Sequence, residues 1–424
     1  MENKRFPWLW IPSLYMAEAL PYVAVMTIST IMYKRLGISN TDIALYTGWL
    51  YLPWVIKPFW SPFVDLIKTK RWWTVAMQFL IAIGFACIAF SLPTSFFFQL
   101  TLAAFWLVAF ASATHDIAAD GFYMHALTDH EQSLYVGIRS TFYRIATVAG
   151  QGLLVILAGF LEKHTDNIPW SWAITMGILS VTFFIVSVYH QFILPRPVSD
   201  HPAKGVSTSA IAVEFFNTFK SFFTKKNALF AILFMLLYRL PEALLVKMIS
   251  PFMLDPREVG GLGLTTEQVG IVYGTVGIIG LTIGGILGGI ASSQGGLKKW
   301  LWPMVMAITL PDLVYVYLSY LQPDNMLLIN ACIFIEQFGY GFGFTAYMLY
   351  LIYFSEGEHK TAHYAMCTGL MALGMMLPGM MAGWLQETIG YRHFFVWTII
   401  CCLATFAVCA FVKIDPEFGK KKQA

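Results

Sequence analysis

The segment LGISNTDIALYTG at residues 36–48 recurs without a gap as LGLTTEQVGIVYG at residues 262–274. Both copies carry a hydroxyl residue, Ser39 or Thr265, followed three residues later by an acid or an amide. This spacing is typical of a capping box at the start of a helix. Because similarity at a fixed offset marks an internal repeat, the two segments predict that the chain consists of two related halves.

The composition excludes a soluble globular protein. The chain has 424 residues, of which 58% are hydrophobic and 12% charged, and its mean hydropathy is +0.64. Apolar runs of about 20 residues, the length that crosses a bilayer as a helix, recur along it. We therefore expect an all-α integral membrane protein. Its twelve transmembrane helices are expected near residues 8–33, 42–60, 73–92, 97–124, 133–160, 170–194, 227–252, 267–291, 300–321, 325–354, 363–386 and 392–413.

The longest polar interruption, at residues 195–226, separates six predicted spans from six. We expect residues 1–194 and 227–424 to form two six-helix halves joined by a cytoplasmic linker. A repeat offset that preserves orientation makes these halves parallel, related by an axis along the membrane normal. Within the linker, three aromatic residues share one helical face near several lysines, which predicts a helix lying on the inner membrane surface: Phe215, Phe219 and Phe222. A disordered tether is the alternative.

The distribution of basic residues predicts the topology. Of 27 Lys and Arg, 17 fall in the loops and tails that share a side with the N-terminus, and 5 fall in the opposite loops. By the positive-inside rule, both termini are expected in the cytoplasm. The first span carries Glu18 and has no small-residue cleavage site, so we do not interpret it as a removable signal peptide. All six cysteines lie in apolar spans without metal-binding spacing, which predicts packing roles and neither metal nor cofactor.

Two acids on the fourth span are the first candidates for function. Asp116 and Asp120 are four residues apart and share one helical face, where ionised carboxylates are costly unless a cation is near. The fifth span offers Arg139 and Arg144, which point to different sides of their helix. We expect Arg144 to face the cavity together with Gln151, two turns further on. The alternative is an Asp–Arg pair that only fastens two helices together.

A carboxylate that pairs with arginine when ionised, and releases it when protonated, can couple a proton to movement of a solute. Asp120 is the first candidate for this role and Glu18 the second, and Asp116 is also expected to take part. Tyr15 and Tyr22 flank Glu18 on one helical face and are expected to bind a polar solute, although a purely structural Glu–Tyr contact is the alternative. His115 points away from the aspartates, and we expect it to be hydrogen-bonded within the fold.

The second half offers its own polar residues. Arg239 and Glu242 flank Pro241, which can break the seventh span and free backbone carbonyls to form part of a site. On the tenth span, three polar residues are expected to bind a neutral hydroxylated solute: Glu336, Gln337 and Tyr340. Asp312 is expected to be structural.

The eighth span carries glycines at four-residue spacing, a pattern that lets helices approach closely and slide. They are Gly280, Gly284 and Gly288. Ordinary tight packing explains the pattern equally well.

Three segments resemble the AmpG-like branch of the major facilitator superfamily. ASATHDIAADGFYMHAL is similar to that branch's "AS-Q-D-I-x-x-D-A" sequence on span four, and its acids match Asp116 and Asp120. STFYRIATVAGQG resembles "GYRLGML-SGG" on span five, matching at Arg144. KPFWSPFVDLIKTKRWW resembles "KFLWSPLMDR", matching at Lys57 and Asp65.

The chain departs from the branch at three positions. His115 replaces a glutamine, Leu66 stands in place of an arginine, and Glu18 stands in place of a serine. An added carboxylate on the first helix is expected to affect either the coupling or the choice of solute.

The resemblance implies the major facilitator fold and a function. Members of the branch import peptidoglycan turnover products, N-acetylglucosaminyl-anhydromuropeptides, in symport with protons. For this chain it implies a monomeric carrier in the bacterial inner membrane whose partners are protons, lipid and a small amino-sugar or muropeptide solute, without nucleic acid. Gating or structural roles are expected for Lys57, Asp65 and Arg139.

Three alternatives stay open. One is a proton-coupled symporter of other oligosaccharides, and another is an exporter. The third is a membrane-embedded acyltransferase using His115, although no nucleophile or metal constellation accompanies that histidine.

Overall fold

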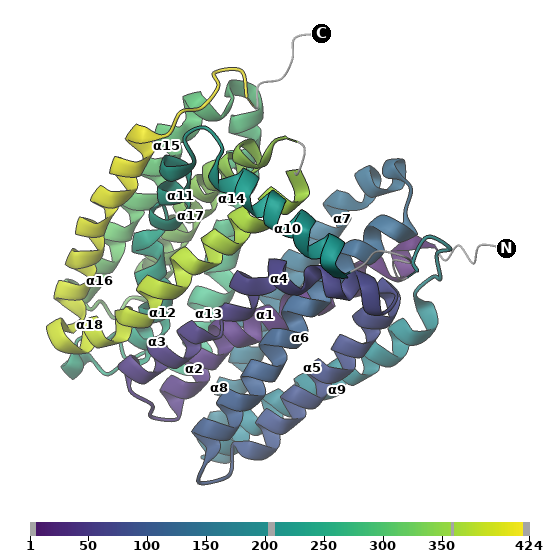
Figure 1. Ribbon diagram of the computed structural model, residues 1–424. Helices are drawn as coiled ribbons and strands as arrows, with labels where there is room; N and C mark the ends of the chain where they lie inside the picture. Colours follow the sequence, from purple (N-terminus) through teal and green to yellow (C-terminus); the bar gives the residue numbers. More distant parts are fainter. Residues whose placement is uncertain (1–5, 202–207, 358–359, 419–424) are drawn as a thin grey trace. The chain divides into compact units, whose positions relative to one another are not determined.

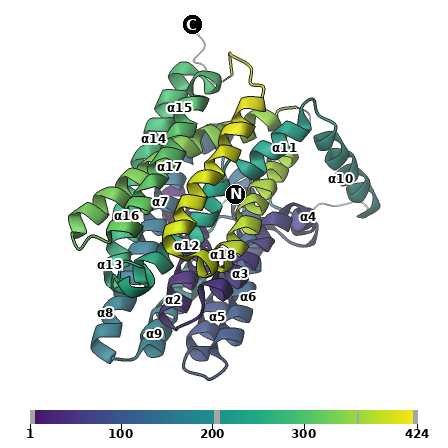
Figure 2. The ribbon, with the colours of Figure 1, turned by 90° about the vertical axis from the view of Figure 1, so that its left-hand side faces the viewer.

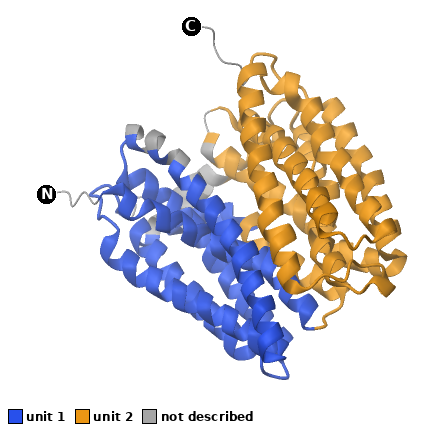
Figure 3. Cartoon of the chain, turned by 180° about the vertical axis from the view of Figure 1, so that it is seen from behind, with its two compact units in different colours: residues 1–36, 56–207 blue, residues 37–55, 208–424 orange. Residues whose placement is uncertain are grey.

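In the computed structural model, which describes residues 6–201, 208–357 and 360–418, every regular element is a helix (Figure 1). The expected all-α architecture is therefore confirmed. The chain divides into two compact units (Figure 3). Unit 1 comprises residues 1–36 and 56–207, and unit 2 comprises residues 37–55 and 208–424.

Unit 1 is a bundle in which α5 packs against α6 and α9, while α1 packs against α7 and α6. Its helices are α1 (Ile11–Val23), α2 (Ser29–Arg35), α5 (Lys70–Ser91), α6 (Phe97–Ala126), α7 (Asp129–Val148), α8 (Val155–Thr165) and α9 (Ile168–Ile193). Two π-helical segments interrupt long helices: Ala24–Ile28 joins α1 to α2, and Ala149–Leu154 joins α7 to α8. The first follows Pro21, which removes a backbone donor from the helical ladder. Such π-turns occur frequently at functional sites.

Unit 2 packs α17 along α14 and α15, and packs α18 against α12, α11 and α3. Figure 2 shows α14, α15 and α17 side by side. Its helices are α3 (Asn40–Trp49), α10 (Thr208–Phe223), α11 (Ala228–Leu237), α12 (Leu240–Leu254), α13 (Thr266–Ile271), α14 (Ile278–Gly295), α15 (Leu297–Thr309), α16 (Leu313–Leu321), α17 (Met326–Ser355) and α18 (Lys360–Phe411). Helix α4 (Leu52–Ile67) runs across the division between the units.

Ten helices in the described residues are long and apolar enough to cross a membrane. The predicted span at 42–60 is broken into α3 and α4, each shorter than the roughly 20 residues that a bilayer requires. The predicted spans at 363–386 and 392–413 run together as α18. Within α18 the helix is broken only at Gly390, whose φ of 74° and ψ of 165° are not helical. The count of twelve spans therefore stays a prediction.

The repeated segments begin helices as expected. The Ser39 hydroxyl accepts a hydrogen bond from the Asp42 backbone at 3.0 Å, and the Thr265 hydroxyl accepts one from Gln268 at 3.2 Å. Gln268 Oε1 in turn accepts from the Thr265 backbone at 2.9 Å, which completes a capping box. Each cap satisfies a backbone N–H that the helix itself leaves without a partner.

The second part of the predicted linker contains α10, whose end is fastened to unit 2. Lys225 Nζ donates to the backbone oxygens of Phe354 and Glu356 at 2.6 and 2.8 Å, and burial lowers the pKa of this amine. Ser221 Oγ lies 2.9 Å from His363 Nε2. Residues 202–207 and the side chain of Phe215 lie outside the described part of the structure. The boundaries 1–194, 195–226 and 227–424, and the surface position of the helix, stay predictions.

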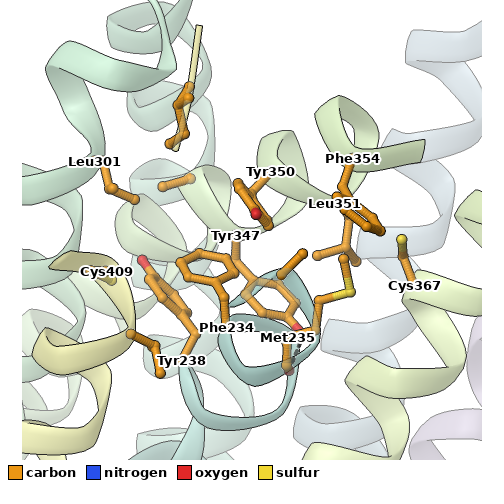
Figure 4. Close-up of a cluster of buried hydrophobic side chains, with 14 of the residues drawn as sticks. Phe234, Met235, Tyr238, Leu301, Tyr347, Tyr350, Leu351, Phe354, Cys367 and Cys409 are labelled. Atoms are coloured by element: carbon orange, nitrogen blue, oxygen red, sulfur yellow. Dashed lines mark hydrogen bonds between the residues drawn. The ribbon is translucent and has the colours of Figure 1, made fainter. Parts of the chain in front are cut away.

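An aromatic cluster forms a core of unit 2 (Figure 4). The rings of Phe234 and Tyr347 stack with centroids 5.8 Å apart, and the Tyr347 hydroxyl donates to the Met235 backbone oxygen at 2.6 Å. Cys367 and Cys409 are buried in the same cluster. All six cysteines are free thiols, of which four are buried, Cys401 is partly buried and Cys87 is exposed.

The glycine stripe of α14 lies against α17. A Cβ on Gly288 would lie 2.8 Å from the backbone oxygen of Phe342, and one on Gly284 would clash with that of Phe338. Gly289, on another side of α14, has open space. The stripe therefore serves close packing of two helices, as small residues do in membrane proteins.

Candidate functional site

Three helices of unit 1 meet at Asp120. Arg139 Nη2, on α7, lies 2.9 Å from Asp120 Oδ1, and the Tyr15 hydroxyl, on α1, donates to the same oxygen at 3.3 Å. The side chains of Arg139 and Asp120 are 29% and 42% exposed, so this pair is accessible to water or a solute. A partly solvated ion pair contributes little to stability, which leaves it able to open.

Two aromatic rings also contact the guanidinium of Arg139. Arg139 Cζ lies 4.5 Å from the ring centre of Tyr15 and 5.3 Å from that of Tyr123, within the range of cation–π attraction. The expectation that Arg144 faces the cavity stays a prediction, and the structure pairs Arg139 with Asp120. Five residues rotate a helix by about 140° beyond a full turn, and Arg144 accordingly lies at an exposed position.

Asp116 forms a second ion pair, with a lysine of α4. Lys57 Nζ, on α4, lies 3.6 Å from Asp116 Oδ2, and that carboxylate is 15% exposed. Lys57 was expected to have a gating or structural role, and the structure joins it to the acid one turn before Asp120. Asp65 also lies on α4, but its side chain is outside the described part of the structure. Gln151, in the second π-helical segment, donates to Thr27 Oγ1 in the first at 3.2 Å.

Glu18 is a buried acid of unit 1 with an unsatisfied oxygen. Its Oε2 is buried and accepts no hydrogen bond from the residues that the structure describes. Burying a carboxylate oxygen without a donor is costly. The carboxylate lies within electrostatic range of two acids and two bases, namely Asp116, Asp120, Lys57 and Arg139. Glu18 therefore shares one charge network with both ion pairs.

Tyr143, on α7, lies near these acids and was not among the residues predicted from the sequence. It is within electrostatic range of Glu18, Tyr22 and both aspartates of α6. Its place beside Arg144 in the family-like motif of the fifth span was the available signal. Tyr22, expected to bind solute, thus lies near the same group.

His115 is hydrogen-bonded within the fold, as predicted. Gln78 Nε2 donates to His115 Nε2 at 2.9 Å, and Gln78 Oε1 accepts from His190 Nδ1 at 2.9 Å. His190 Nε2 lies 2.8 Å from Ser13 Oγ. This buried chain joins α1, α5, α6 and α9, so it stabilises the bundle around the acids.

In unit 2 the helix breaks where Pro241 predicted it. Arg239 lies between α11 and α12, and its Nη2 donates to the Tyr340 hydroxyl. The break leaves the Tyr238 carbonyl without its helical partner, and Thr405 Oγ1 donates to it at 3.1 Å. Re-satisfying freed backbone groups in this way allows a broken helix inside a membrane.

Buried acids accompany this break. Glu336 Oε2 accepts from the Tyr315 hydroxyl at 2.8 Å and from Gln337 Nε2 at 3.0 Å. Glu242 is 6% exposed and lies within electrostatic range of Glu336. Asp312, expected to be structural, is buried within range of both. Tyr315 and Gln337 thus both donate to Glu336, whereas the Arg239 guanidinium donates to the Tyr340 hydroxyl.

Membrane-length helices, several of them broken or π-bulged and with ion pairs among them, define a polytopic membrane protein. The profile of the Major Facilitator Superfamily matches residues 13–365, and the chain belongs to this family. It is a secondary transporter and not an enzyme, which excludes the acyltransferase alternative.

Comparison with named relatives shows which branch of the family the chain resembles. The chain is 26% identical to the putative transporter AmpG 4 of Rickettsia conorii, over 94% of each chain. It is 24% identical to the anhydromuropeptide permease of Escherichia coli K12, over 89% of this chain and 72% of the permease. The predicted likeness to the AmpG-like branch is thus confirmed.

A solved structure of the nucleoside transporter NupG, in a mutant form, has the same fold. Its TM-score is 0.74 at 15% identity, and the match covers 96% of this chain and 99% of that one.

Proposed function

We propose that the protein imports peptidoglycan-derived amino sugars or muropeptides across the bacterial inner membrane in symport with protons. The names of its relatives support the solute class. The observation that carries the coupling is Glu18, a buried acid without a hydrogen-bond donor, in one charge network with the Asp120–Arg139 pair. A carboxylate oxygen in that position is satisfied by a proton or by a donor group of a bound solute.

The coupling step is the opening of the Asp120–Arg139 pair. An ionised Asp120 holds Arg139 through a charge-assisted hydrogen bond at 2.9 Å. Protonation of Asp120 removes that charge, so Arg139 keeps only the aromatic faces of Tyr15 and Tyr123. Since α1, α6 and α7 meet at this pair, protonation releases contacts between helices, which is how a local charge change biases a conformational equilibrium.

The side chains proposed to bind solute carry hydroxyl or charged groups. Unit 1 contributes Glu18 and Tyr22, and unit 2 has a separate group, Arg239, Glu242 and Tyr340. Glu336 and Gln337 position this second group, because Tyr315 and their mutual contact occupy them.

Transport by the full-length protein in proteoliposomes tests the proposal. With an inward proton gradient, we expect unmodified N-acetylglucosaminyl-anhydromuropeptide to accumulate inside above its external concentration, and a protonophore to abolish this accumulation. Concentrative uptake of neutral disaccharides in its place would favour the oligosaccharide alternative. Equal accumulation with and without the proton gradient would contradict proton symport.

A further inference from the structure

Lys247, on α12, is a buried cation that the proposed mechanism does not use. The residue is 1% exposed, and its Nζ donates to Thr47 Oγ1 at 2.8 Å. The Thr47 hydroxyl donates its own hydrogen to the Ile43 backbone oxygen at 2.6 Å, so its oxygen is an acceptor for the amine. The ring centre of Tyr51 lies 5.2 Å from Nζ. All these residues belong to unit 2.

The charge of Lys247 has no counter-ion among the described residues. An ammonium group has three N–H donors, and Thr47 accepts one of them. No carboxylate lies within salt-bridge distance of Nζ in the described part of the chain. By contrast, the intramembrane cations Lys57 and Arg139 each face an aspartate. An intramembrane charge without a partner is expensive, so it marks a functional position.

The surroundings of Lys247 are those of a solute site. Thr47 lies in the last turn of α3, and Tyr51 lies in the turn that separates α3 from α4. Broken helices in carriers contribute to solute sites, because their irregular backbone is tolerated only in protein-lined surroundings. The aromatic ring beside the amine offers a flat apolar face of the kind that sugar rings contact.

We propose that Lys247 binds a carboxylate of the transported solute. This inference rests on the proposed import function and specifies its solute as acidic. A carboxylate would supply the missing negative charge and acceptors for the two remaining N–H groups of the ammonium. A neutral oligosaccharide would leave that charge uncompensated, so the site discriminates against it.

Binding by the full-length protein in detergent tests this with two probes, N-acetylmuramic acid and its methyl ester. We expect the wild type to bind the acid about tenfold more tightly than the ester, which corresponds to about 1.4 kcal/mol. Lys247→Met should bind both probes equally, whereas Lys247→Arg should keep the preference. Lys298→Met, which changes an exposed lysine of the same unit, should behave as the wild type does.

Equal binding of acid and ester by the wild type would overturn the inference, as would a Lys247→Met variant that keeps the preference. If Lys247→Met does not fold, the wild-type comparison and the Lys247→Arg variant still decide. Uptake of anhydromuropeptide by proteoliposomes is measured separately. Uptake without acid preference overturns only the role of Lys247, and acid preference without uptake overturns only the proposed cargo.

Discussion

The proposed coupling pair, Asp120 with Arg139, is partly solvated. A half-exposed ion pair contributes about 0–1 kcal/mol, so its loss should leave the protein folded. We predict that Asp120→Asn abolishes proton-driven accumulation in proteoliposomes and leaves the melting temperature nearly unchanged. Asp324→Asn is the control, since Asp324 is 90% exposed and pairs with Arg257 at 2.5 Å. Unaltered uphill uptake by Asp120→Asn would remove this residue from the coupling step.

Glu18 and Glu162 are both glutamates of unit 1, but they differ in the hydrogen bonds that their carboxylates accept. Glu162 accepts from Arg35 at 3.1 Å and from Trp172 Nε1 at 2.9 Å, whereas Glu18 Oε2 has no donor in the described structure. We predict that Glu18→Gln abolishes proton-driven uptake without lowering the melting temperature, because it removes a buried charge that lacks a donor. Glu162→Gln should lower the melting temperature, because charge-assisted hydrogen bonds are worth more than neutral ones.

Both quantities are measured on the same preparations, by thermal unfolding in detergent and by uptake in proteoliposomes. A Glu18→Gln variant that is clearly less stable than the wild type would assign that residue to structure.

The sequence predicted some of these residues and missed others for geometric reasons. Spacing of four places Asp116 and Asp120 on one helical face whatever the tertiary structure. The choice between Arg139 and Arg144 depends on how α7 is rotated against its neighbours, which no local pattern encodes. The hydrogen bonds of Gln78 join it to residues 37 and 112 positions away, so they too were invisible in the sequence.

At the scale of helices, the fit of α14 against α17 depends on individual glycines. We predict that Gly284→Ala lowers stability by about 1–3 kcal/mol, since a Cβ there clashes with a backbone carbonyl that cannot move independently. Gly289→Ala is the control, because that position has open space. Thermal unfolding in detergent measures both variants. Equal melting temperatures would show that the two helices can separate without loss of stability.

Helix α3 belongs to the first half by sequence and to unit 2 by packing. Asn40 Nδ2 donates to Gln386 Oε1 at 2.6 Å and to the Tyr391 hydroxyl at 3.0 Å, and the Thr41 hydroxyl donates to Glu387. Asn40 is separated in the chain from Gln386 by 346 positions and from Tyr391 by 351. The repeat alignment predicted the start and cap of α3 correctly, but long-range polar contacts determine which unit it joins.

For the whole molecule, the number of crossings decides where the termini lie. Ten helices in the described residues qualify as spans, and α18 counts as two if the break at Gly390 reverses its direction. With α18 counted twice, the ten helices give eleven crossings, an odd number that would place the termini on opposite sides. The excess of Lys and Arg instead predicts that both termini lie in the cytoplasm. The two statements agree only if α3 and α4 together cross the bilayer as one broken span.

We therefore predict that the loop before α3 and the loop after α4 face opposite sides of the membrane. Single cysteines at Ser39 and Lys68, in a variant whose six native cysteines are serine, should differ in labelling by a membrane-impermeant maleimide in intact cells. Position 39 should react, and position 68 should react only after the membrane is opened. Reaction of both positions in intact cells would make α3 and α4 a re-entrant pair. The two termini would then lie on opposite sides, and the predicted parallel halves would be lost, since their equal orientation requires an even number of crossings between the repeats.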